Sequence, residues 1–234
     1  MAAQLVIDIG NSRVKAGLVE EGALQESFLV ASPEELTQWQ GYQVIFIDTR
    51  GDKHWRAVLA ALEAEELTRA RPLPFPTLYS QELGADRAAQ LIAAWAAQRF
   101  PAAVVSLGTA FVLDYLDEQG THVGGIISPG AHLRLRALAE NTGRLPRLSL
   151  TPVEAHLGRD TASALRAGAL HGLGFELQGW LSLLPAHTTL WVCGGEYALL
   201  ARYLPSNAIF APDLTLKGVW LWWHYLHDGS ASGG

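Results

Sequence analysis

The chain has 234 residues, of which 49% are hydrophobic, and it carries a formal net charge of −6 with only three lysines. This length allows one large or two small domains with a buried core, and the composition is that of a globular rather than a disordered or membrane protein. The acidic balance argues against nucleic-acid binding, which usually needs a basic face.

Two further features bear on location. The sequence contains no run of about 18 apolar residues, and it begins with a strand-like segment that lacks the pattern of a signal peptide. A single cysteine, Cys193, excludes an internal disulfide and fits a reducing compartment. We therefore expect a cytoplasmic protein without membrane contact.

The first hundred residues alternate between strand patterns and helix patterns. Ser32, followed by Pro33 and Glu35, is typical of a helix start. The run 71–76 holds three prolines and is expected to form a loop, after which Gly84 opens an alanine-rich helix. The predicted strands are 4–9, 13–19, 23–30 and 43–48, and the predicted helices are 33–39, 54–67 and 84–100.

The second half repeats this order. Pro129-Gly130 breaks the chain before a helix, Asp160 is placed to cap a longer one, and Gly194-Gly195 leads from a strand into a further helix. The C-terminal helix is rich in tryptophan. The predicted strands are 103–107, 109–116, 122–128 and 190–193, and the predicted helices are 132–141, 161–184, 196–203 and 216–226.

One short pattern occurs twice. The segment 7–22 aligns without a gap on 105–120, and both copies read as strand, glycine turn, small polar residue and second strand. Two such turns that face one cleft can hold a polyphosphate from both sides. The identical pairs are Gly10/Gly108, Val14/Val112, Leu18/Leu116, Glu20/Glu118 and Gly22/Gly120.

Groups of strands followed by helices predict an α/β fold of two lobes, each a mixed sheet flanked by helices. We expect an N-terminal lobe over 1–101, with the first phosphate-binding turn and the substrate-site helix. A C-terminal lobe over 102–228 would hold the second turn. The small polar tail 229–234 is expected to be disordered.

Asp8 is a polar residue at the end of an apolar strand, where burial is costly without a partner or a cleft. Gly10 lets the backbone approach a ligand, and the turn N–H groups with Asn11 and Ser12 can cradle phosphate. The alternative is an ordinary hairpin turn in which the aspartate accepts backbone hydrogen bonds. The second copy of the pattern favours the phosphate site.

Asp86 and Arg87 lie in the first turn of the predicted helix that Gly84 opens. In one interpretation Asp86 only complements the helix dipole and Arg87 is a solvated surface residue. In the other, Asp86 is a general base for a hydroxyl and Arg87 binds an anionic substrate.

Five motifs occur in an order that resembles type III pantothenate kinases, over about residues 5–195. The resemblance implies the phosphotransferase fold of actin, hexokinase and Hsp70, with duplicated ribonuclease H-like lobes, which matches the internal repeat. The motifs are Asp8-x-Gly10-Asn11-Ser12-x-x-Lys15, Gly84-Ala85-Asp86-Arg87, Gly108-Thr109-Ala110 with Asp114, Gly124-Gly125-x-Ile127-x-Pro129-Gly130, and Asp160-Thr161.

The resemblance implies ATP-dependent phosphorylation of pantothenate to 4′-phosphopantothenate, the first step of coenzyme A biosynthesis. It implies Mg²⁺ with ATP, a homodimer, and Asp86 as the catalytic proton acceptor. The implied ATP-binding residues are Asp8, Ile9, Gly10, Asn11, Ser12, Arg13, Val14, Lys15 and Thr109. The implied pantothenate-binding residues are Gly84, Ala85, Asp86, Arg87 and Thr161.

Two positions depart from the family pattern. Ser106 stands where the family has an aspartate that binds K⁺ or NH₄⁺, so either this ion is dispensable or another group, such as Asp114, replaces that aspartate. The family also has a substrate-contacting tyrosine seven residues before the glycine at position 84, whereas Tyr79 lies five before it. Tyr79 is the candidate for that contact.

Several alternatives stay open. The substitution at Ser106 allows a catalytically silent homologue that binds pantothenate or nucleotide in a regulatory or accessory role. A kinase of the same fold that acts on another hydroxylated acid or sugar is a third interpretation. Gly194-Gly195 fits either a loop beside the adenosine or a simple turn. The sequence has no P-loop and no dinucleotide-binding glycine motif.

Overall fold

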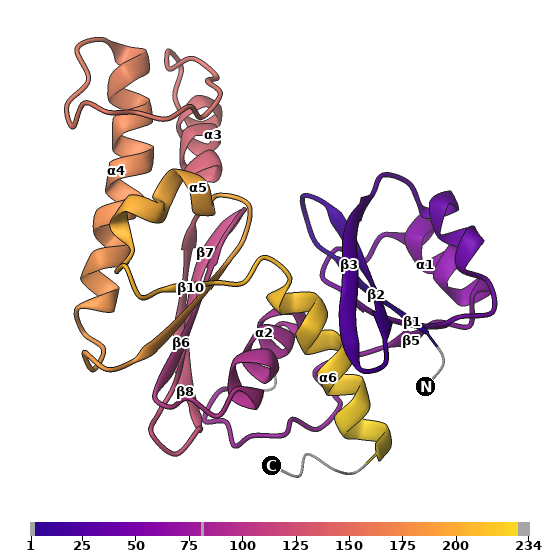
Figure 1. Cartoon of the computed structure of the whole chain (residues 1–234). Helices are drawn as coiled ribbons and strands as arrows, with labels where there is room; N and C mark the ends of the chain where they lie inside the picture. Colours follow the sequence, from indigo (N-terminus) through magenta and orange to yellow (C-terminus); the bar gives the residue numbers. More distant parts are fainter. Residues whose placement is uncertain (1–2, 81, 229–234) are drawn as a thin grey trace. The chain divides into compact units, whose positions relative to one another are not determined.

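The computed structural model describes residues 3–80 and 82–228, and the chain divides into two compact units. The first unit, called the N unit here, comprises Met1–Arg99, Leu116–Gly124 and Asp213–Gly234. The second, the C unit, comprises Phe100–Tyr115 and Gly125–Pro212. Each unit contains one five-stranded sheet with helices beside it (Figure 1).

The N-unit sheet has the strand order β3-β2-β1-β4-β5. β1 pairs antiparallel with β2 and parallel with β4, so the sheet is mixed. β1 is buried on both faces, which explains its nearly continuous apolar sequence. The strands are β1 (Gln4–Ile9), β2 (Val14–Glu20), β3 (Ala23–Val30), β4 (Gln43–Asp48) and β5 (Glu65–Glu66).

Helices complete the core of the N unit. Leu5, Ile7 and Ile9 of β1 pack with Trp55 and Leu59 of the helix that follows β4. α2 and α6 pack against each other, and α6 also contacts β1, β2 and β4. The helices are η1 (Pro33–Trp39), α1 (Lys53–Ala61), α2 (Ala85–Ala96) and α6 (Leu214–Asp228).

The C-unit sheet has the order β10-β9-β6-β7-β8, and β6 pairs parallel with β9. The end of β7 and the start of β8, up to Gly124, fall within the N unit. Leu107 and Phe111 pack there with Leu170, Leu173 and Leu177 of α4. The strands are β6 (Ala102–Leu107), β7 (Ala110–Leu116), β8 (His122–Pro129), β9 (Thr189–Cys193) and β10 (Ile209–Phe210). The helices are α3 (Ala131–Asn141), α4 (Thr161–Leu181), α5 (Tyr197–Leu200) and η2 (Ala201–Tyr203).

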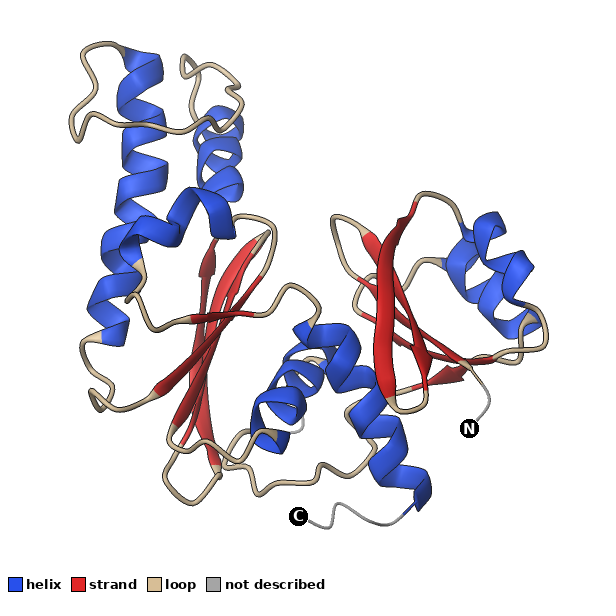
Figure 2. Cartoon of the chain, viewed as in Figure 1, coloured by secondary structure: helices blue, strands red, loops and turns tan. Residues whose placement is uncertain are grey.

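The two sheets have the same topology. When the first sheet is taken from β3 and the second from β8, the orders β3-β2-β1-β4-β5 and β8-β7-β6-β9-β10 correspond strand for strand. The repeat in the sequence is therefore a repeat of architecture, and the predicted α/β fold of duplicated lobes is confirmed. Figure 2 shows the two sheets in red with their blue helices. No described helix is long and apolar enough to cross a membrane.

Most predicted elements match, with physical reasons for the exceptions. The predicted helix 54–67 is wrong beyond Ala61, because Glu63 adopts a positive φ of 54° and Glu65–Glu66 then pairs with β4. The helix that Ser32 was expected to cap is a 3₁₀ helix. Among the described residues, the Ser32 side chain makes no capping hydrogen bond to it. At Asp160 the predicted cap is present: Ser163 N–H donates to Asp160 Oδ1 at 2.9 Å, and Asp160 N–H donates to Ser163 Oγ at 3.1 Å.

The observed division of the chain also differs from the expected lobes. The C-terminal helix α6 belongs to the N unit rather than to a lobe over 102–228, because it packs on α2 and on the N-unit sheet. Trp220 Nε1 donates a hydrogen bond to Gln4 Oε1 at 2.8 Å, and Trp223 Nε1 donates to Glu65 Oε2 at 2.8 Å. The predicted tail 229–234 lies outside the described residues.

Candidate active site

The first glycine turn joins β1 to β2. Gly10 N–H donates to the Arg13 carbonyl at 3.1 Å, and a Cβ at Gly10 would lie 3.2 Å from the same oxygen. The turn residues Asn11, Ser12 and Arg13 are exposed. The turn therefore presents polar side chains and backbone to solvent at the end of a buried strand.

Asp8 lies at this turn and interacts with Asp86. Burial of the Asp8 carboxyl, together with the negative charge of Asp86, raises the pKa of Asp8 to about 7, against the opposing effect of Arg13 and Lys15. The Asp8 Oδ1 atom is sealed from solvent and has no hydrogen-bond partner among the described residues. Two carboxylates from distant parts of the sequence thus interact electrostatically within the N unit.

The N-terminus of α2 determines the position of the Asp86 side chain. Gly84 is the N-cap residue, and Asp86 lies in the first helical turn, where the helix dipole favours a negative charge. A Cβ at Gly84 would lie 2.6 Å from Asp86 Oδ1. A larger residue at position 84 would therefore displace the carboxylate, which explains glycine in the Gly-Ala-Asp-Arg motif.

Arg87 is buried, with 6% of its surface exposed, and is oriented by Tyr79. Its guanidinium lies 4.7 Å from the centre of the Tyr79 ring, and Nη1 donates to the Tyr79 hydroxyl at 3.2 Å. The Tyr79 ring stacks on His122, with ring centres 5.6 Å apart. His122 is fully buried and shares a hydrogen bond of 3.0 Å between its Nδ1 and Thr77 Oγ1.

Lys15 lies on β2 opposite Asp8 in the strand register. Its Nζ atom forms an ion pair of 2.6 Å with Asp213 Oδ1, at the start of α6. Lys15 is thus held by the C-terminal segment of the same unit.

The C unit contains the second glycine turn and the remaining predicted residues. Gly108 N–H donates to the Ala110 carbonyl at 3.1 Å. Ser106 is half-buried near the end of β6, and Thr109 is exposed in the turn. Asp114 is buried on β7, and Thr161 is the exposed first residue of α4.

The N unit thus brings together Asp8, Tyr79, Gly84, Asp86 and Arg87, and the C unit holds Ser106, Thr109 and Thr161. The side chains of Ile9 and Val14 lie in the N-unit core, so only their backbone is available to a nucleotide. Sequence reasoning missed Thr77, His122 and Asp213 as neighbours of the site. The feature that distinguishes His122 is its complete burial within an alternating strand, and the sequence does not show burial.

The donor set of the N unit fits a divalent cation bound together with phosphates. Two interacting carboxylates, one with an orphaned oxygen, create negative charge that a cation would neutralise, and Mg²⁺ commonly binds one or two carboxylates plus phosphates and water. Among the described residues, no group of three or more His, Cys, Asp or Glu side chains could enclose a metal. Most ligands of such an ion would therefore come from water and substrate.

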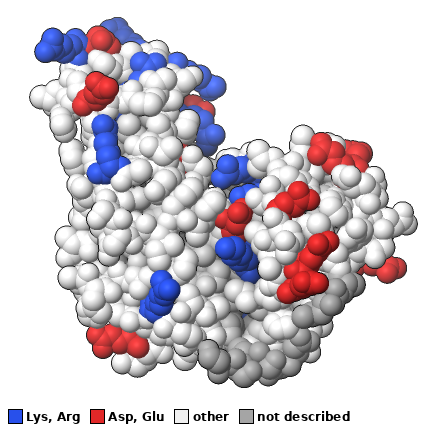
Figure 3. Space-filling model, in the orientation of Figure 1, with Lys and Arg blue, Asp and Glu red and all other residues white. Residues whose placement is uncertain are grey.

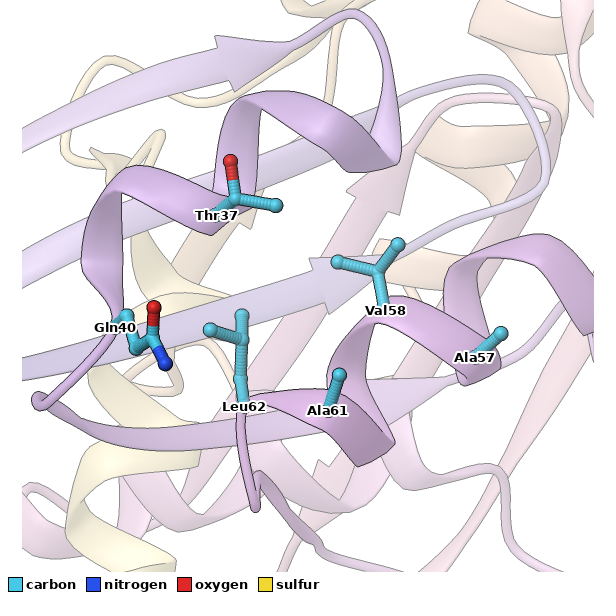
Figure 4. A pocket seen from close by; sticks show the side chains of 6 residues that line it. All are labelled: Thr37, Gln40, Ala57, Val58, Ala61 and Leu62. Atoms are coloured by element: carbon cyan, nitrogen blue, oxygen red, sulfur yellow. The ribbon is translucent and has the colours of Figure 1, made fainter.

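A hollow of about 280 Å³ lies elsewhere in the N unit, between η1 and α1 (Figure 4). Thr37 and Gln40 of the η1 region face Ala57, Val58 and the end of α1 across it. This hollow contains none of the predicted site residues and no ionisable side chain, so it offers nothing for phosphoryl transfer. The remaining lining residues are Ala61 and Leu62.

Comparisons with known proteins identify the family. Residues 52–182 match the family model described as type III pantothenate kinase. The type III pantothenate kinase of Alkalilimnicola ehrlichii is 32% identical, over 92% of this chain and 95% of the relative. That of Porphyromonas gingivalis strain W83 is 30% identical, over 94% of this chain and 97% of the relative.

Solved structures support the fold. A conserved Baf family protein from Campylobacter jejuni has a TM-score of 0.63 at 23% identity and covers 92% of this chain and 94% of its own. An ethanolamine utilization protein from Carboxydothermus hydrogenoformans has a TM-score of 0.54 at 12% identity, over 95% of this chain and 90% of its own. At these identities the likeness concerns architecture alone.

Proposed function

This chain belongs to the type III pantothenate kinase family, and from that membership we propose which of its residues carry the reaction. The chain uses ATP to phosphorylate pantothenate, the first step of coenzyme A biosynthesis. The observation that carries the assignment of roles is the interaction of Asp8 with Asp86 at the start of α2.

Asp86 is the proton acceptor. The primary hydroxyl oxygen of pantothenate attacks the γ-phosphorus of ATP, the bond from this phosphorus to the β,γ-bridging oxygen breaks, and ADP leaves. The hydroxyl proton passes to the Asp86 carboxylate as the new bond forms. Phosphoryl transfer needs little covalent help, so most of the acceleration comes from positioning and charge neutralisation.

Arg87 binds the pantothenate carboxylate. Its guanidinium is already held by the ring and hydroxyl of Tyr79, so little side-chain freedom is lost when substrate binds. Tyr79 supports this role despite its changed spacing from Gly84. Gly84, Ala85 and Thr161 are the further pantothenate contacts that the family pattern suggests.

The turns bind the nucleotide. The segment from Asp8 to Lys15 contacts the phosphates through its exposed backbone and polar side chains, and Thr109 supplies a contact from the second turn. The kinase family implies a divalent metal with ATP, and we assign Mg²⁺, held near Asp8 mainly through water and phosphate. When bound, this ion would neutralise the phosphate charge.

The serine at position 106 affects whether the enzyme needs a monovalent cation. A neutral hydroxyl can provide one oxygen ligand but not the charge that favours K⁺ or NH₄⁺, so the enzyme is expected to work without either ion.

The enzyme is a homodimer in this proposal. The C unit exposes large apolar side chains on and after α4, with Phe175 55%, Trp180 38% and Leu183 74% exposed. In Figure 3 the surface over the C-terminal half of α4 carries few charges. Exposed apolar area of this kind is typical of protein interfaces. A cytoplasmic location is also proposed, from the single, buried Cys193.

The function is tested with γ-labelled ATP, Mg²⁺ and a panel of acceptors that includes pantothenate, other hydroxylated acids and sugars. Label on pantothenate, at rates that differ less than about twofold between potassium and sodium buffers, supports the proposal. Label on another acceptor favours a kinase of different specificity. Tight ligand binding without any transfer indicates a catalytically silent homologue.

A further inference from the structure

Glu196 is a buried carboxylate without an assigned role. It follows the Gly194-Gly195 turn after β9, and 6% of its surface is exposed. A buried carboxylate is costly unless hydrogen bonds compensate it. Glu196 has three such bonds, from Ala131 N–H at 3.0 Å, from His132 N–H at 3.2 Å, and with His132 Nδ1 at 2.8 Å.

These bonds place the carboxylate at the N-terminus of α3. The first N–H groups of a helix have no partner within the helix, and the positive end of the helix dipole favours an anion. The N-cap residue of α3 is Gly130, which has no side chain to satisfy these groups. Glu196, 65 residues away in sequence, takes over the capping function.

The same two segments hold both sides of the second glycine turn. Glu196 N–H donates to the Leu107 carbonyl at 2.9 Å, and Gly130 N–H donates to the Thr109 carbonyl at 3.0 Å. The Glu196 side chain links these two segments to each other. The hydrogen bonds therefore close a ring around Gly108, all of it within the C unit.

The ring has little steric freedom. A Cβ at Gly130 would lie 2.0 Å from the Gly108 carbonyl oxygen, and one at Gly194 would lie 2.1 Å from the Leu107 oxygen. Gly194 also has a φ of +105°, which favours glycine. Backbone thus packs directly on backbone, so a shift of the segments that Glu196 links would displace the turn.

We propose that Glu196 is a positioning residue that holds the Leu107–Thr109 turn in its nucleotide-binding shape and thereby sets the KM for ATP. The inference rests on the proposed role of this turn in binding ATP. The carboxylate acts through the N-terminus of α3 and does not touch substrate. Loss of the clamp should therefore affect ATP far more than pantothenate.

The test compares Glu196→Ala, Glu196→Gln and His132→Ala with Glu140→Gln. Glu140 lies at the C-terminal end of α3, away from Ala131 and His132, and pairs with Arg147 at 3.5 Å, so it serves as the matched control on the same helix. Glu196→Ala should raise the KM for ATP roughly tenfold, the effect of losing charge-assisted hydrogen bonds, with less than a twofold change in the KM for pantothenate. Glu196→Gln and His132→Ala should show smaller changes in the same direction.

Amide hydrogen exchange at residues 107–109 tests the positioning step without any substrate. Faster exchange there in Glu196→Gln, with exchange in the N unit unchanged, supports the proposal even if pantothenate is not the acceptor. If Glu196→Ala does not fold, Glu196→Gln and His132→Ala carry the test. Unchanged exchange at the turn, or equal rises in both KM values, overturns the proposal.

Discussion

The two glycine turns occupy equivalent places in sheets of the same topology, one after β1 and the other after β6, but they carry different charges. Asp8 precedes the first turn, and its position corresponds to Ser106 before the second. Asp8 interacts with a second carboxylate, Asp86, whereas the second turn offers a neutral hydroxyl and backbone groups.

The hydrogen bonds that hold the two turns in place differ as well. In the N unit, Thr49 N–H donates to the Ile9 carbonyl at 3.0 Å, and the exposed Arg50 side chain reaches the Gly10 carbonyl at 2.8 Å. In the C unit, the equivalent carbonyl of Leu107 accepts from Glu196, whose side chain is buried. The exposed Arg50 guanidinium thus stabilises the first turn, and the buried Glu196 carboxylate at the N-terminus of α3 stabilises the second.

The duplicated architecture thus divides its chemistry between the two units. The N unit concentrates negative charge and the groups suited to proton transfer and carboxylate binding. The C unit keeps the glycine turn in a rigid backbone frame without an acidic residue at the corresponding position. If this division is correct, substitutions at Asp86 and Tyr79 should act on turnover and pantothenate, and those that disturb the second glycine turn should act on ATP.

Replacing Asp86 should have the largest effect. Asp86→Ala is expected to lower kcat at least ~10²-fold, as for the loss of a general base, with little change in the KM for ATP. Steady-state assays with pantothenate and ATP measure both constants. The control is Asp52→Ala, because Asp52 also begins an N-unit helix but caps α1. Turnover of Asp86→Ala equal to that of the wild type would remove Asp86 from the mechanism.

Asp8→Asn should change how stability depends on pH. The folded pKa of Asp8 is raised to about 7 from 3.8, so between these values the unfolded chain loses the proton while the folded chain keeps it. The free energy of unfolding therefore falls as pH rises through this window, by a few kcal/mol from this group.

Urea unfolding from pH 4 to pH 8 in metal-free buffer measures this dependence in the wild type and in Asp8→Asn. Asp8→Asn lacks the titrating group, so it should gain stability over the wild type as pH rises and keep that gain above pH 7. Parallel curves for the two proteins would contradict the raised pKa. The same variant should lose activity, since an amide cannot replace the carboxylate beside the phosphates.

Gly130→Ala tests the frame of the second turn. The added Cβ would meet the Gly108 carbonyl at 2.0 Å, and overpacking of this kind typically costs about 1–3 kcal/mol. We expect lower thermal stability together with a raised KM for ATP. In Gly143→Ala the new Cβ would have no described atom within 4 Å, so this control should match the wild type. Equal behaviour of the two variants would argue against a rigid frame.

Tyr79→Phe should have the smallest effect. It removes the hydroxyl that accepts from Arg87 but keeps the ring on which the guanidinium lies. One such hydrogen bond is worth about 0.5–1.5 kcal/mol, so the KM for pantothenate should rise about 2- to 10-fold at constant kcat. The exposed Tyr42 supplies the control, Tyr42→Phe. A change in kcat alone would mean that Tyr79 does not act through substrate binding.

The sequence predicted the strands that build both sheets because their signals are local. Apolar runs bounded by glycine turns placed β1, β3 and β4 at their observed bounds, and the repeat anticipated the common topology. Helix α1 was extended too far because residues 62–67 favour a helix by composition. Their strand arises from pairing with β4, which only the folded chain provides.

The site was predictable where motifs are contiguous and hidden where contacts are distant. Gly84, Asp86 and Arg87 share one helix start, so their spacing was informative. His122 reaches Tyr79 across 43 residues of sequence, and Glu196 reaches α3 from a different strand–helix connection. Such contacts depend on tertiary packing, and nothing in the local pattern around either residue predicts a partner.

The electrostatic interaction of Asp8 with Asp86 is tested most directly by titrating the Asp8 side chain with carboxyl ¹³C NMR in metal-free buffer. The wild type should show an Asp8 pKa near 7, and Asp86→Asn should lower it because the neighbouring negative charge is gone. An ordinary Asp8 pKa near 4 that does not respond to Asp86→Asn would contradict the account.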